Sequence, residues 1–189
     1  MRTKIRDLAM LALITVAGGL TSATAIAGVE ETDAPGIENF SRIEGSVGLA
    51  DSLVGFGGPT QPSAMAWLKS QGFATVINLR LATEEDADVD DSRAAAQAAG
   101  LKYIHVPLNP KEASPDDVDG VVSALADAAN QPVYIHCGTA TRAAALWMIA
   151  RVREDGWNID AAFAEAEVIA AKPDDALAFA TRFIAARQE

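Results

Sequence analysis

The stretch that most constrains the fold is an apolar, β-branched run that ends in a cysteine and leads through a short loop into an alanine-rich segment. The run is Val133–His136, the cysteine is Cys137, and the alanine-rich segment begins at Ala143. Strands that feed directly into helices predict a parallel sheet with helices packed on its faces. At such a junction the strand end faces a helix N-terminus, where backbone N–H groups and the helix dipole stabilise anions.

Two side chains at this junction suit chemistry on an oxyanion. Cys137 is the only cysteine of the chain, and a thiol beside a helix N-terminus readily forms the nucleophilic thiolate. Arg142 adds a planar fork of N–H donors that fits a tetrahedral oxyanion. Two structural alternatives stay open. In the first, Cys137 is only a small buried core residue. In the second, Arg142 serves only to form an ion pair with Glu84 or Glu85.

The rest of the chain continues this alternation of short strands and helices. Further strands are expected at 43–56, 74–79 and 102–106, and helices at 62–71, 84–99, 114–129, 143–153, 159–171 and 174–187. We therefore predict an α/β fold in which helices flank a central, mostly parallel sheet of four to five strands. In such sheets ligands bind at the carboxyl ends of the strands, so three strand ends should converge on one site. These are 78–80, 106–109 and 136–137.

The first 27 residues have the pattern of a secretory signal rather than of a folded element. Basic residues come first, an apolar stretch follows, and an A-x-A cleavage site ends the segment. In order, these are Arg2, Lys4 and Arg6, then Leu8–Val16, then Ala25–Ala27. We expect residues 1–27 to be cleaved and the protein to be exported to a bacterial periplasm. Residues 28–42 would form a flexible mature N-terminus, and residues 43–189 would form one folded domain.

Charge and cysteine content narrow the range of partners. The chain has a formal net charge of −11, which becomes −13 once the signal with its three basic residues and one acid is removed. Such an acidic surface disfavours nucleic acid and anionic membranes, so we expect no nucleic-acid partner and no stable membrane association after cleavage. The single cysteine and the two histidines lack the spacing of metal ligands. No metal and no cofactor are predicted.

Three motifs in a fixed order resemble a known family. They are Gly58-Pro59-Thr60, Val76-Ile77-Asn78-Leu79-Arg80 and the loop from Cys137 to Arg142. The chain resembles bacterial members of the tyrosine and dual-specificity phosphatase superfamily, and most closely the phosphatase-like domain named for its occurrence beside β-lactamase-like hydrolases. That resemblance implies a three-layer tyrosine phosphatase-like architecture and hydrolysis of phosphomonoesters, phosphotyrosine among them. Small phosphate esters, other oxyanions and phosphoproteins are the substrates it implies.

The resemblance also implies roles for the loop residues. Cys137 would form a phosphocysteine, Arg142 would hold two substrate oxygens, and His136 would fix the loop through its carbonyl groups. Backbone N–H groups would line the phosphate cradle, and a threonine hydroxyl would donate to the thiolate. The residues implied for substrate binding in this loop are Gly138, Thr139, Ala140, Thr141 and Ala143, with Thr139 or Thr141 as the hydroxyl donor.

Several positions depart from the usual phosphatase pattern. Four residues separate Cys137 from Arg142, where most cysteine phosphatases have five, and Ala143 replaces the usual Ser or Thr. The resemblance implies an Asp as the general acid, and its position corresponds to Asn109 here; an amide cannot protonate a leaving oxygen. Arg80 is either part of the pocket rim, with Asn109, or one member of a surface ion pair. Asp116 and Asp117 are the other candidates for the acid, but their place at the start of a helix already explains them.

Two other classes of function remain compatible with the residues. Rhodanese-type sulfurtransferases also present a cysteine at a strand end with a shorter loop, and a persulfide on Cys137 needs no general acid. A non-catalytic module that only binds oxyanions is the third class. The missing Asp and the short loop favour sulfur transfer, while the ordered set of three motifs favours a phosphatase.

Overall fold

The computed structural model describes residues 28–46 and 48–185, so the predicted signal at 1–27 lies outside the described residues. Short strands and helices alternate through most of the chain, as predicted. The strands are β1 (Val29–Glu31), β2 (Ser41–Ser46), β3 (Leu49–Gly57), β4 (Thr75–Asn78), β5 (Lys102–His105) and β6 (Val133–His136). The helices are α1 (Ala64–Ser70), α2 (Val89–Ala98), α3 (Pro115–Ala126), α4 (Thr141–Arg153), α5 (Ile159–Ile169) and α6 (Pro173–Ala185), with a short 3₁₀ turn at Ala128–Asn130.

The sheet has the order β1-β2-β3-β6-β4-β5. Strands β3, β6, β4 and β5 run parallel, whereas β1, β2 and β3 pair antiparallel. The predicted α/β fold with a mostly parallel sheet is therefore confirmed. The sheet is larger than expected for two reasons: the segment 43–56 belongs to the β2–β3 hairpin and not to one strand, and Val29–Glu31 adds β1 at the edge. Gly45 and Gly48 in this hairpin have positive φ angles of 91° and 66°, which glycine adopts at no steric cost.

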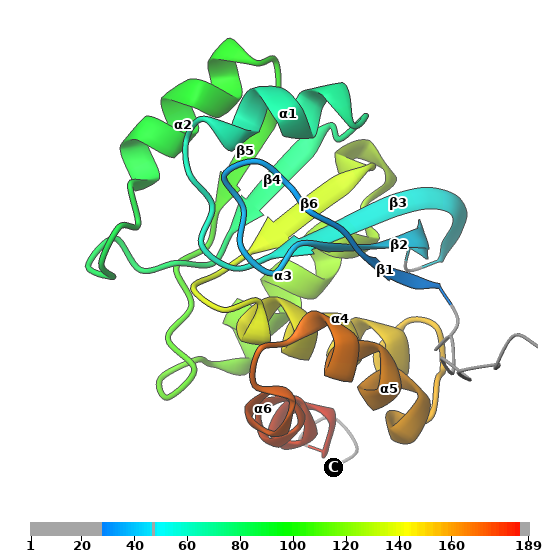
Figure 1. Ribbon diagram of the computed structural model, residues 1–189. Helices are drawn as coiled ribbons and strands as arrows, with labels where there is room; N and C mark the ends of the chain where they lie inside the picture. Colours follow the sequence, from blue (N-terminus) through cyan, green and yellow to red (C-terminus); the bar gives the residue numbers. More distant parts are fainter. Residues whose placement is uncertain (1–27, 47, 186–189) are drawn as a thin grey trace, which may run out of the picture.

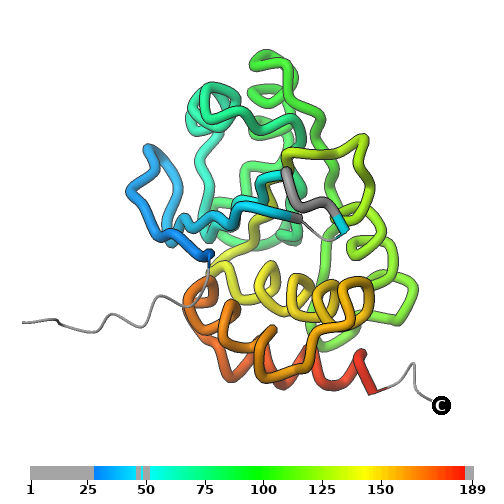
Figure 2. Tube along the Cα trace, turned by 90° about the vertical axis from the view of Figure 1, so that its right-hand side faces the viewer, coloured from blue at the N-terminus to red at the C-terminus, as the bar shows by residue number. Residues whose placement is uncertain are grey.

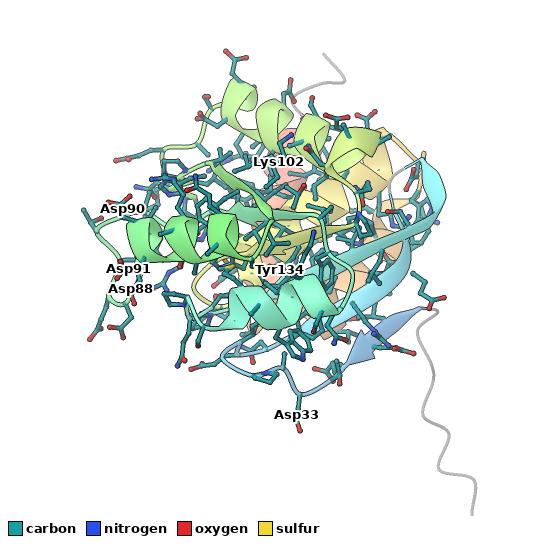
Figure 3. The ribbon with its side chains drawn as sticks, turned by 90° about the horizontal axis from the view of Figure 1, so that it is seen from above. Asp33, Asp88, Asp90, Asp91, Lys102 and Tyr134 are labelled. Carbon is teal, nitrogen blue, oxygen red and sulfur yellow. The ribbon has the colours of Figure 1, made fainter. Side chains whose placement is uncertain are left out.

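Helices cover both faces of the sheet, which makes the three layers that the sequence predicts (Figure 1). Alternate residues of the central strands point to opposite faces. On β6, Val133 and Ile135 belong to the core beneath α3–α6, whereas Tyr134 belongs to the core beneath α1 and α2. Figure 3 shows Tyr134 inside the molecule, and Asp88, Asp90 and Asp91 at the outer end of α2. The central parallel strands β4 and β6 are thus buried on both sides.

Residues 28–42 differ from the flexible terminus that was expected. Val29–Glu31 pairs with β2, and the side chains of Ile37 and Phe40 are buried against α1 and β6. The ring of Phe40 meets that of Trp67 edge-on at a centroid distance of 5.2 Å. Burial of these two apolar side chains outweighs the polar, proline- and glycine-containing composition that predicted mobility.

Helix boundaries follow local signals in some places and tertiary contacts in others. Ser114 caps α3 as predicted, because its side chain accepts from the Asp117 N–H while the Asp117 carboxylate accepts from the Ser114 N–H. By contrast, α2 begins at Val89 and not at residue 84. Asp86 and Asp88 have positive φ angles, so the acidic run 84–88 forms a loop. That loop borders the site described below.

The last three helices form one compact layer. Helix α4 lies at its centre, and residues 143–151 are all buried. Helices α5 and α6 pack against α4 and against each other, and Figures 1 and 2 show them side by side on the same face of the sheet. Within the described part of the chain, no helix has the length and hydropathy needed to cross a membrane.

Candidate active site

The three strand ends predicted to converge lie together at the carboxyl edge of the sheet. Asn78 of β4 is paired with His136 of β6 on one side and with His105 of β5 on the other. Arg142 joins the segments that follow these strands, since its Nη1 donates to the carbonyl oxygens of Leu79 and Leu108, both at 3.0 Å. The predicted convergence is confirmed, and it is centred on the loop after β6.

Cys137 follows β6 directly and is 1% exposed. Its N–H donates to the carbonyl of Gly57 over 3.1 Å, which anchors the start of the loop to β3. The loop then turns into α4 at Ala140, whose φ of 57° is unusual for a residue with a side chain. Arg142, the second residue of α4, reaches back to the loop, so that its Nη2 lies 3.5 Å from the position of a Cβ at Gly138, the residue after Cys137. The loop thus brings together the two residues that the sequence predicts to act on an oxyanion.

The loop threonines bond to each other. The Thr139 hydroxyl donates to Thr141 Oγ1 over 3.1 Å, and the Thr141 hydroxyl lies 3.4 Å from the Thr139 carbonyl. No bond from either hydroxyl to the thiol of Cys137 is present among the described contacts. A hydroxyl bond to the thiolate, which the resemblance implies, would require the exchange of one of these partners.

Glu84 forms the main ion pair of Arg142. Its carboxylate accepts from Nη1 at 2.7 Å and from Nη2 at 2.8 Å, a two-point arrangement that orients the guanidinium plane. Burial alone would raise the pKa of Glu84, but the hydrogen bonds from Arg142, from the Leu81 N–H and from Arg80 hold it below its ordinary value. Burial opposes the charge of Arg142 too, yet the bonds to Glu84 raise its pKa above the ordinary value. Both groups are therefore charged.

The ion pair lies against the loop. A Cβ at Gly138 would stand 3.2 Å from Glu84 Oε2 and 3.5 Å from Arg142 Nη2. Glycine at this position leaves the carboxylate room to approach. The sequence left open that Arg142 serves only as the ion-pair partner of Glu84 or Glu85 and has no role in binding an oxyanion. The structure contains the pair with Glu84, and its position shows that pairing and a role at the loop are compatible.

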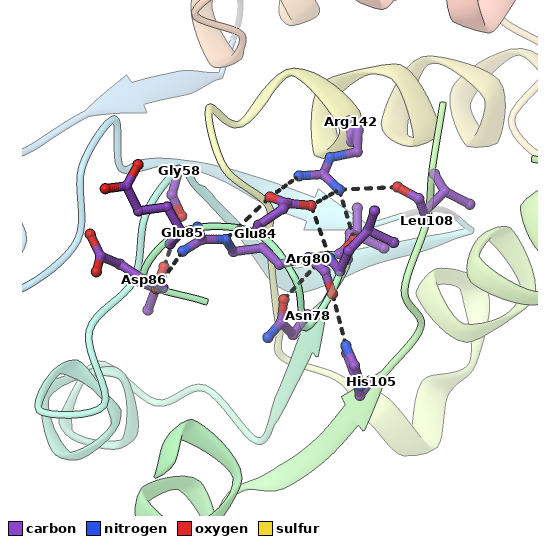
Figure 4. A network of polar contacts seen from close by, with 12 residues as sticks. Gly58, Asn78, Arg80, Glu84, Glu85, Asp86, His105, Leu108 and Arg142 are labelled. Carbon is purple, nitrogen blue, oxygen red and sulfur yellow. Dashed lines mark hydrogen bonds and ion pairs between the residues drawn. The ribbon is translucent and has the colours of Figure 1, made fainter. Parts of the chain in front are cut away.

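Arg80 is buried behind Glu84 and is neither at a surface nor in an isolated pair (Figure 4). Its Nε lies 3.4 Å from Glu84 Oε2, and its Nη1 and Nη2 donate to the carbonyls of Asp86 and Glu85. The carbonyl of Arg80 in turn lies 2.8 Å from His105 Nε2. Arg80 therefore holds the 84–86 loop in place, and through that loop it holds the partner of Arg142.

His136 is fully buried and is held differently from what was expected. Its ring stacks on that of Tyr134, with a centroid distance of 5.5 Å and an angle of 12° between planes. It lies near the backbone of Gly58, but neither ring nitrogen has hydrogen-bonding geometry to a described atom. The expected bonds to loop carbonyls are thus not present. Burial, reinforced by the charge of Arg80, lowers the pKa of His136 to about 3, so the ring is neutral.

Asn109 shapes the loop after β5. Its Nδ2 donates to Glu112 Oε2 over 2.9 Å, and its Oδ1 accepts from the Lys111 N–H over 3.1 Å. The amide is thus engaged within its own loop. Asp117 is engaged in the cap of α3, and its bonds with Ser114 lower its pKa. Neither residue is arranged as a proton donor in this structure.

A cavity of about 500 Å³ opens beside the loop. It shares Thr139, Thr141 and Arg142 with the loop. The remaining wall comes from the loop after β5, from α4, and from α6 with the residue before it: Pro110, Lys111, Ala145, Lys172, Asp175, Ala178, Phe179 and Arg182. Sequence analysis missed the cations among these residues because they lie up to 71 positions apart, and no local pattern connects them.

The chain matches a family model. The family is described as "Beta-lactamase hydrolase-like protein, phosphatase-like domain", and the match covers residues 55–154. This range includes the three motifs quoted above and the whole of α4. No curated protein sequence matches this chain.

Solved structures with the same fold are known. A Cys-to-Ser variant of TpbA from P. aeruginosa, solved in complex with pTyr, has 20% identity and a TM-score of 0.62, with 85% of this chain and 90% of that chain covered. The core catalytic domain of the PP-IP phosphatase SIW14 from S. cerevisiae has 18% identity and a TM-score of 0.59, with 78% and 87% covered. Tk-PTP in its active form has 16% identity and a TM-score of 0.56, with 70% and 91% covered. At these identities the likeness establishes the fold.

Proposed function

Since this chain belongs to the family of the phosphatase-like domain of β-lactamase hydrolase-like proteins, we propose that it hydrolyses phosphomonoesters with Cys137 as the nucleophile. Membership of the family supports a tyrosine phosphatase-like phosphoric monoester hydrolase. The observation that carries the mechanism is the position of Arg142: the guanidinium is oriented by Glu84 on one edge, and its Nη2 lies 3.5 Å from the position of a Cβ at Gly138, the residue after Cys137. A nucleophile and an oxyanion-binding cation then act at the same point.

In the first step the Cys137 thiolate attacks phosphorus and forms an S–P bond. The P–O bond of the ester breaks, and the leaving oxygen takes the bonding electrons and later a proton from water. Arg142 and the loop N–H groups bind the equatorial oxygens, whose charge is greatest in the transition state. In this role the loop residues Gly138, Thr139, Ala140, Thr141 and Ala143 contribute through their backbone.

In the second step water attacks the phosphocysteine. The new P–O bond forms as the S–P bond breaks, inorganic phosphate leaves, and the thiolate of Cys137 is restored. A thiolate is a good leaving group, and the positive charge of Arg142 favours its return. His136, neutral and buried, takes no proton in either step and serves to position the strand end.

The leaving group is expected to be one that departs without a proton donor. Asn109 has an amide where relatives carry an acid, and it is engaged with Glu112 and Lys111. Phenols leave more readily than aliphatic alcohols because their oxyanions are less basic. Aryl phosphates, including phosphotyrosine, which the TpbA variant holds in its crystal structure, are therefore the first substrates to test.

The first experiment measures the intact mass of the protein and its release of phosphate from p-nitrophenyl phosphate. A phosphate adduct, or phosphate release that disappears in Cys137→Ser, supports the proposal. Phosphate release that is unchanged in Cys137→Ser would refute Cys137 as the nucleophile. Arg142→Lys is the companion variant, since it keeps the charge but removes the planar fork.

Sulfur transfer is the second candidate, and the four-residue loop favours it because a shorter loop makes a smaller cradle. Attack of the Cys137 thiolate on the outer sulfur of thiosulfate would break the S–S bond, release sulfite and leave a persulfide on the cysteine. A mass gain of one sulfur after thiosulfate treatment, without any phosphate release, would assign the protein to this class. If oxyanions bind without either reaction, the protein is a binding module.

We also propose that the protein is exported after cleavage near Ala27. The basic, apolar and A-x-A pattern of residues 1–27 supports this. The mass of the protein recovered from a periplasmic fraction checks it: a mature chain that begins near Gly28 is expected, and an intact N-terminus in the cytoplasm would contradict it.

A further inference from the structure

Three basic side chains line the cavity beside the catalytic loop. Lys111 comes from the loop after β5, Lys172 precedes α6, and Arg182 lies on α6. The opposite wall contains Thr139, Thr141 and Arg142 of the loop itself. A molecule bound at the loop can therefore extend into this cavity.

These three cations have no carboxylate partner within residues 28–46 and 48–185. Every other described arginine has one: Arg42, Arg80, Arg93, Arg142, Arg151 and Arg153. The chain has 26 acidic and 15 basic residues, so carboxylates are abundant. One carboxylate, Asp175, also lines the cavity, but it forms no ion pair with the three cations. The cavity therefore keeps a positive charge in an acidic protein.

The structure holds the Arg182 side chain, and the backbone next to Lys172, in place relative to the loop. Arg182 donates from Nη2 to the carbonyl of Pro110 over 2.8 Å, and its guanidinium lies 5.1 Å and 4.5 Å from the ring centres of Phe179 and Phe183. The Ala171 N–H donates to the carbonyl of Thr139 over 3.2 Å, which attaches the segment with Lys172 to the catalytic loop. The other guanidinium N–H groups of Arg182 have no acceptor among the described residues.

We propose that this cavity binds a second phosphate group of the substrate, so that the preferred substrate is a small molecule with two phosphates. The inference rests on the proposed function, because the first phosphate must be the one held by Cys137 and Arg142. Three cations match the charge of one dianionic phosphate better than that of a single carboxylate. A neutral aromatic leaving group would leave them without a partner.

Two kinds of molecule satisfy this chemistry. In a phosphoanhydride the second phosphate is itself the leaving group, and it departs as a weakly basic anion that needs no proton donor. In a bisphosphate ester a carbon skeleton joins the two groups, and the second phosphate only adds affinity. Both place a phosphate among Lys111, Lys172 and Arg182, and separate substrates tell them apart.

The test compares kcat/KM for three compounds: inorganic pyrophosphate, fructose 1,6-bisphosphate and p-nitrophenyl phosphate. Lys172→Gln and Arg182→Gln are measured in the full chain, each beside wild type. We expect a fall of about 10- to 100-fold in the ratio of kcat/KM for a two-phosphate compound to that for p-nitrophenyl phosphate. The compound with the larger fall identifies the anhydride or the bisphosphate. An unchanged ratio for both compounds in both variants would overturn the proposal.

Two further variants control for charge and for folding. Lys69→Gln removes one exposed lysine on α1, far from the cavity in the fold, and should leave the ratio unchanged. Asp175→Asn removes the carboxylate of the cavity and should raise the ratio for two-phosphate compounds by a few-fold. A lower ratio in Asp175→Asn would contradict an electrostatic role for the cavity. Lys172 is exposed, so Lys172→Gln is expected to fold even if Arg182→Gln does not.

The outcome separates this inference from the proposed function. If Cys137 hydrolyses p-nitrophenyl phosphate but Lys172→Gln and Arg182→Gln leave the ratio unchanged, the second subsite is refuted and the phosphatase stands. If nothing is hydrolysed, calorimetry with inorganic pyrophosphate still tests the cavity. Pyrophosphate binding that weakens at least 10-fold in Lys172→Gln supports the phosphate site in the cavity without the reaction. Binding that is unchanged in Lys172→Gln, or no binding at all, refutes the second phosphate site as well as the proposed function.

Discussion

Glu84 determines how Arg142 faces the loop, because its carboxylate accepts from both terminal nitrogens of the guanidinium. Glu84→Gln replaces one accepting oxygen with a donor, so the two-point bond is lost and the guanidinium can turn. We expect kcat/KM on an aryl phosphate to fall about 10- to 100-fold. Glu85→Gln is the matched control, since only the backbone carbonyl of Glu85 is used, by Arg80. Equal activity in both variants would show that Glu84 has no positioning role.

His136 links stability to pH because its pKa is lowered to about 3 in the folded state. The unfolded chain binds a proton near pH 6.5 and the folded one does not, so stability is greatest above pH 6.5 and falls as pH drops toward 3. The expected loss between pH 7 and pH 5 is about 2 kcal/mol in the free energy of unfolding.

Urea denaturation at the two pH values measures this loss, and NMR of the imidazole reports its protonation. The His136 ring should stay neutral from pH 5 to pH 8. His136→Gln is the control variant, and its stability should change less over the same interval. A His136 signal that titrates near pH 6.5 in the folded protein would contradict the prediction.

At the scale of elements, a buried polar network joins α4 to α5. Arg151 donates to both oxygens of Glu165 at 3.0 and 3.2 Å, and Trp147 Nε1 donates to the same carboxylate at 2.6 Å. The guanidinium also lies 4.3 Å from the ring centres of Trp147 and Trp157. The two helices are thus fixed by one buried carboxylate and one guanidinium that is largely shielded from water.

Removal of one charge from this network should be costly. Glu165→Gln leaves Arg151 with Asp155 as its remaining carboxylate partner, and we expect a loss of about 3 kcal/mol in the free energy of unfolding. Chemical denaturation measures the loss. Glu167→Gln, an exposed position on the same helix, should change stability by less than about 0.5 kcal/mol. A Glu165→Gln protein as stable as wild type would mean that the pair does not stabilise the helix contact.

The start of α3 offers a smaller, local test. Ser114→Ala removes the side-chain oxygen that accepts from the Asp117 N–H and should cost about 1 kcal/mol in unfolding free energy. Ser123→Ala changes an exposed serine inside the same helix and should be neutral or slightly stabilising. Thermal denaturation of the two variants compares them, and equal Tm values would show that the cap is unimportant.

For the whole molecule, the family range is smaller than the folded unit. The family match ends at residue 154, whereas α5 and α6 lie beyond it and cover α4. Deletion of residues 155–189 would expose the buried side chains of α4, including Trp147, and would remove Glu165. We expect the shortened chain to lose cooperative unfolding and near-UV circular dichroism. A shortened protein with a sharp urea transition would show that residues 28–154 fold alone.

Features that depend on residues close together in the chain, such as strands and helix caps, could be predicted from the sequence alone. Periodicity predicted the strand before Cys137, and Ser114 with Pro115 predicted the start of α3, because strands and caps are encoded within a few positions. The convergence of strand ends followed from the topology of parallel sheets. These local and topological rules were enough for the fold class and for the loop that holds Cys137 and Arg142.

Contacts between side chains that are far apart in the sequence became visible only in the tertiary structure. Glu84 and Arg142 are 58 positions apart, and their ion pair lies in a loop where the sequence predicted the start of a helix. That helix, α2, begins at Val89 instead. Residues 28–46 joined the sheet because Phe40 and Ile37 found apolar neighbours in the chain's interior. Lys111, Lys172 and Arg182 share a cavity because α6 folds back beside the loop after β6. Long-range burial and charge pairing depend on positions in space, which no local pattern of residues specifies.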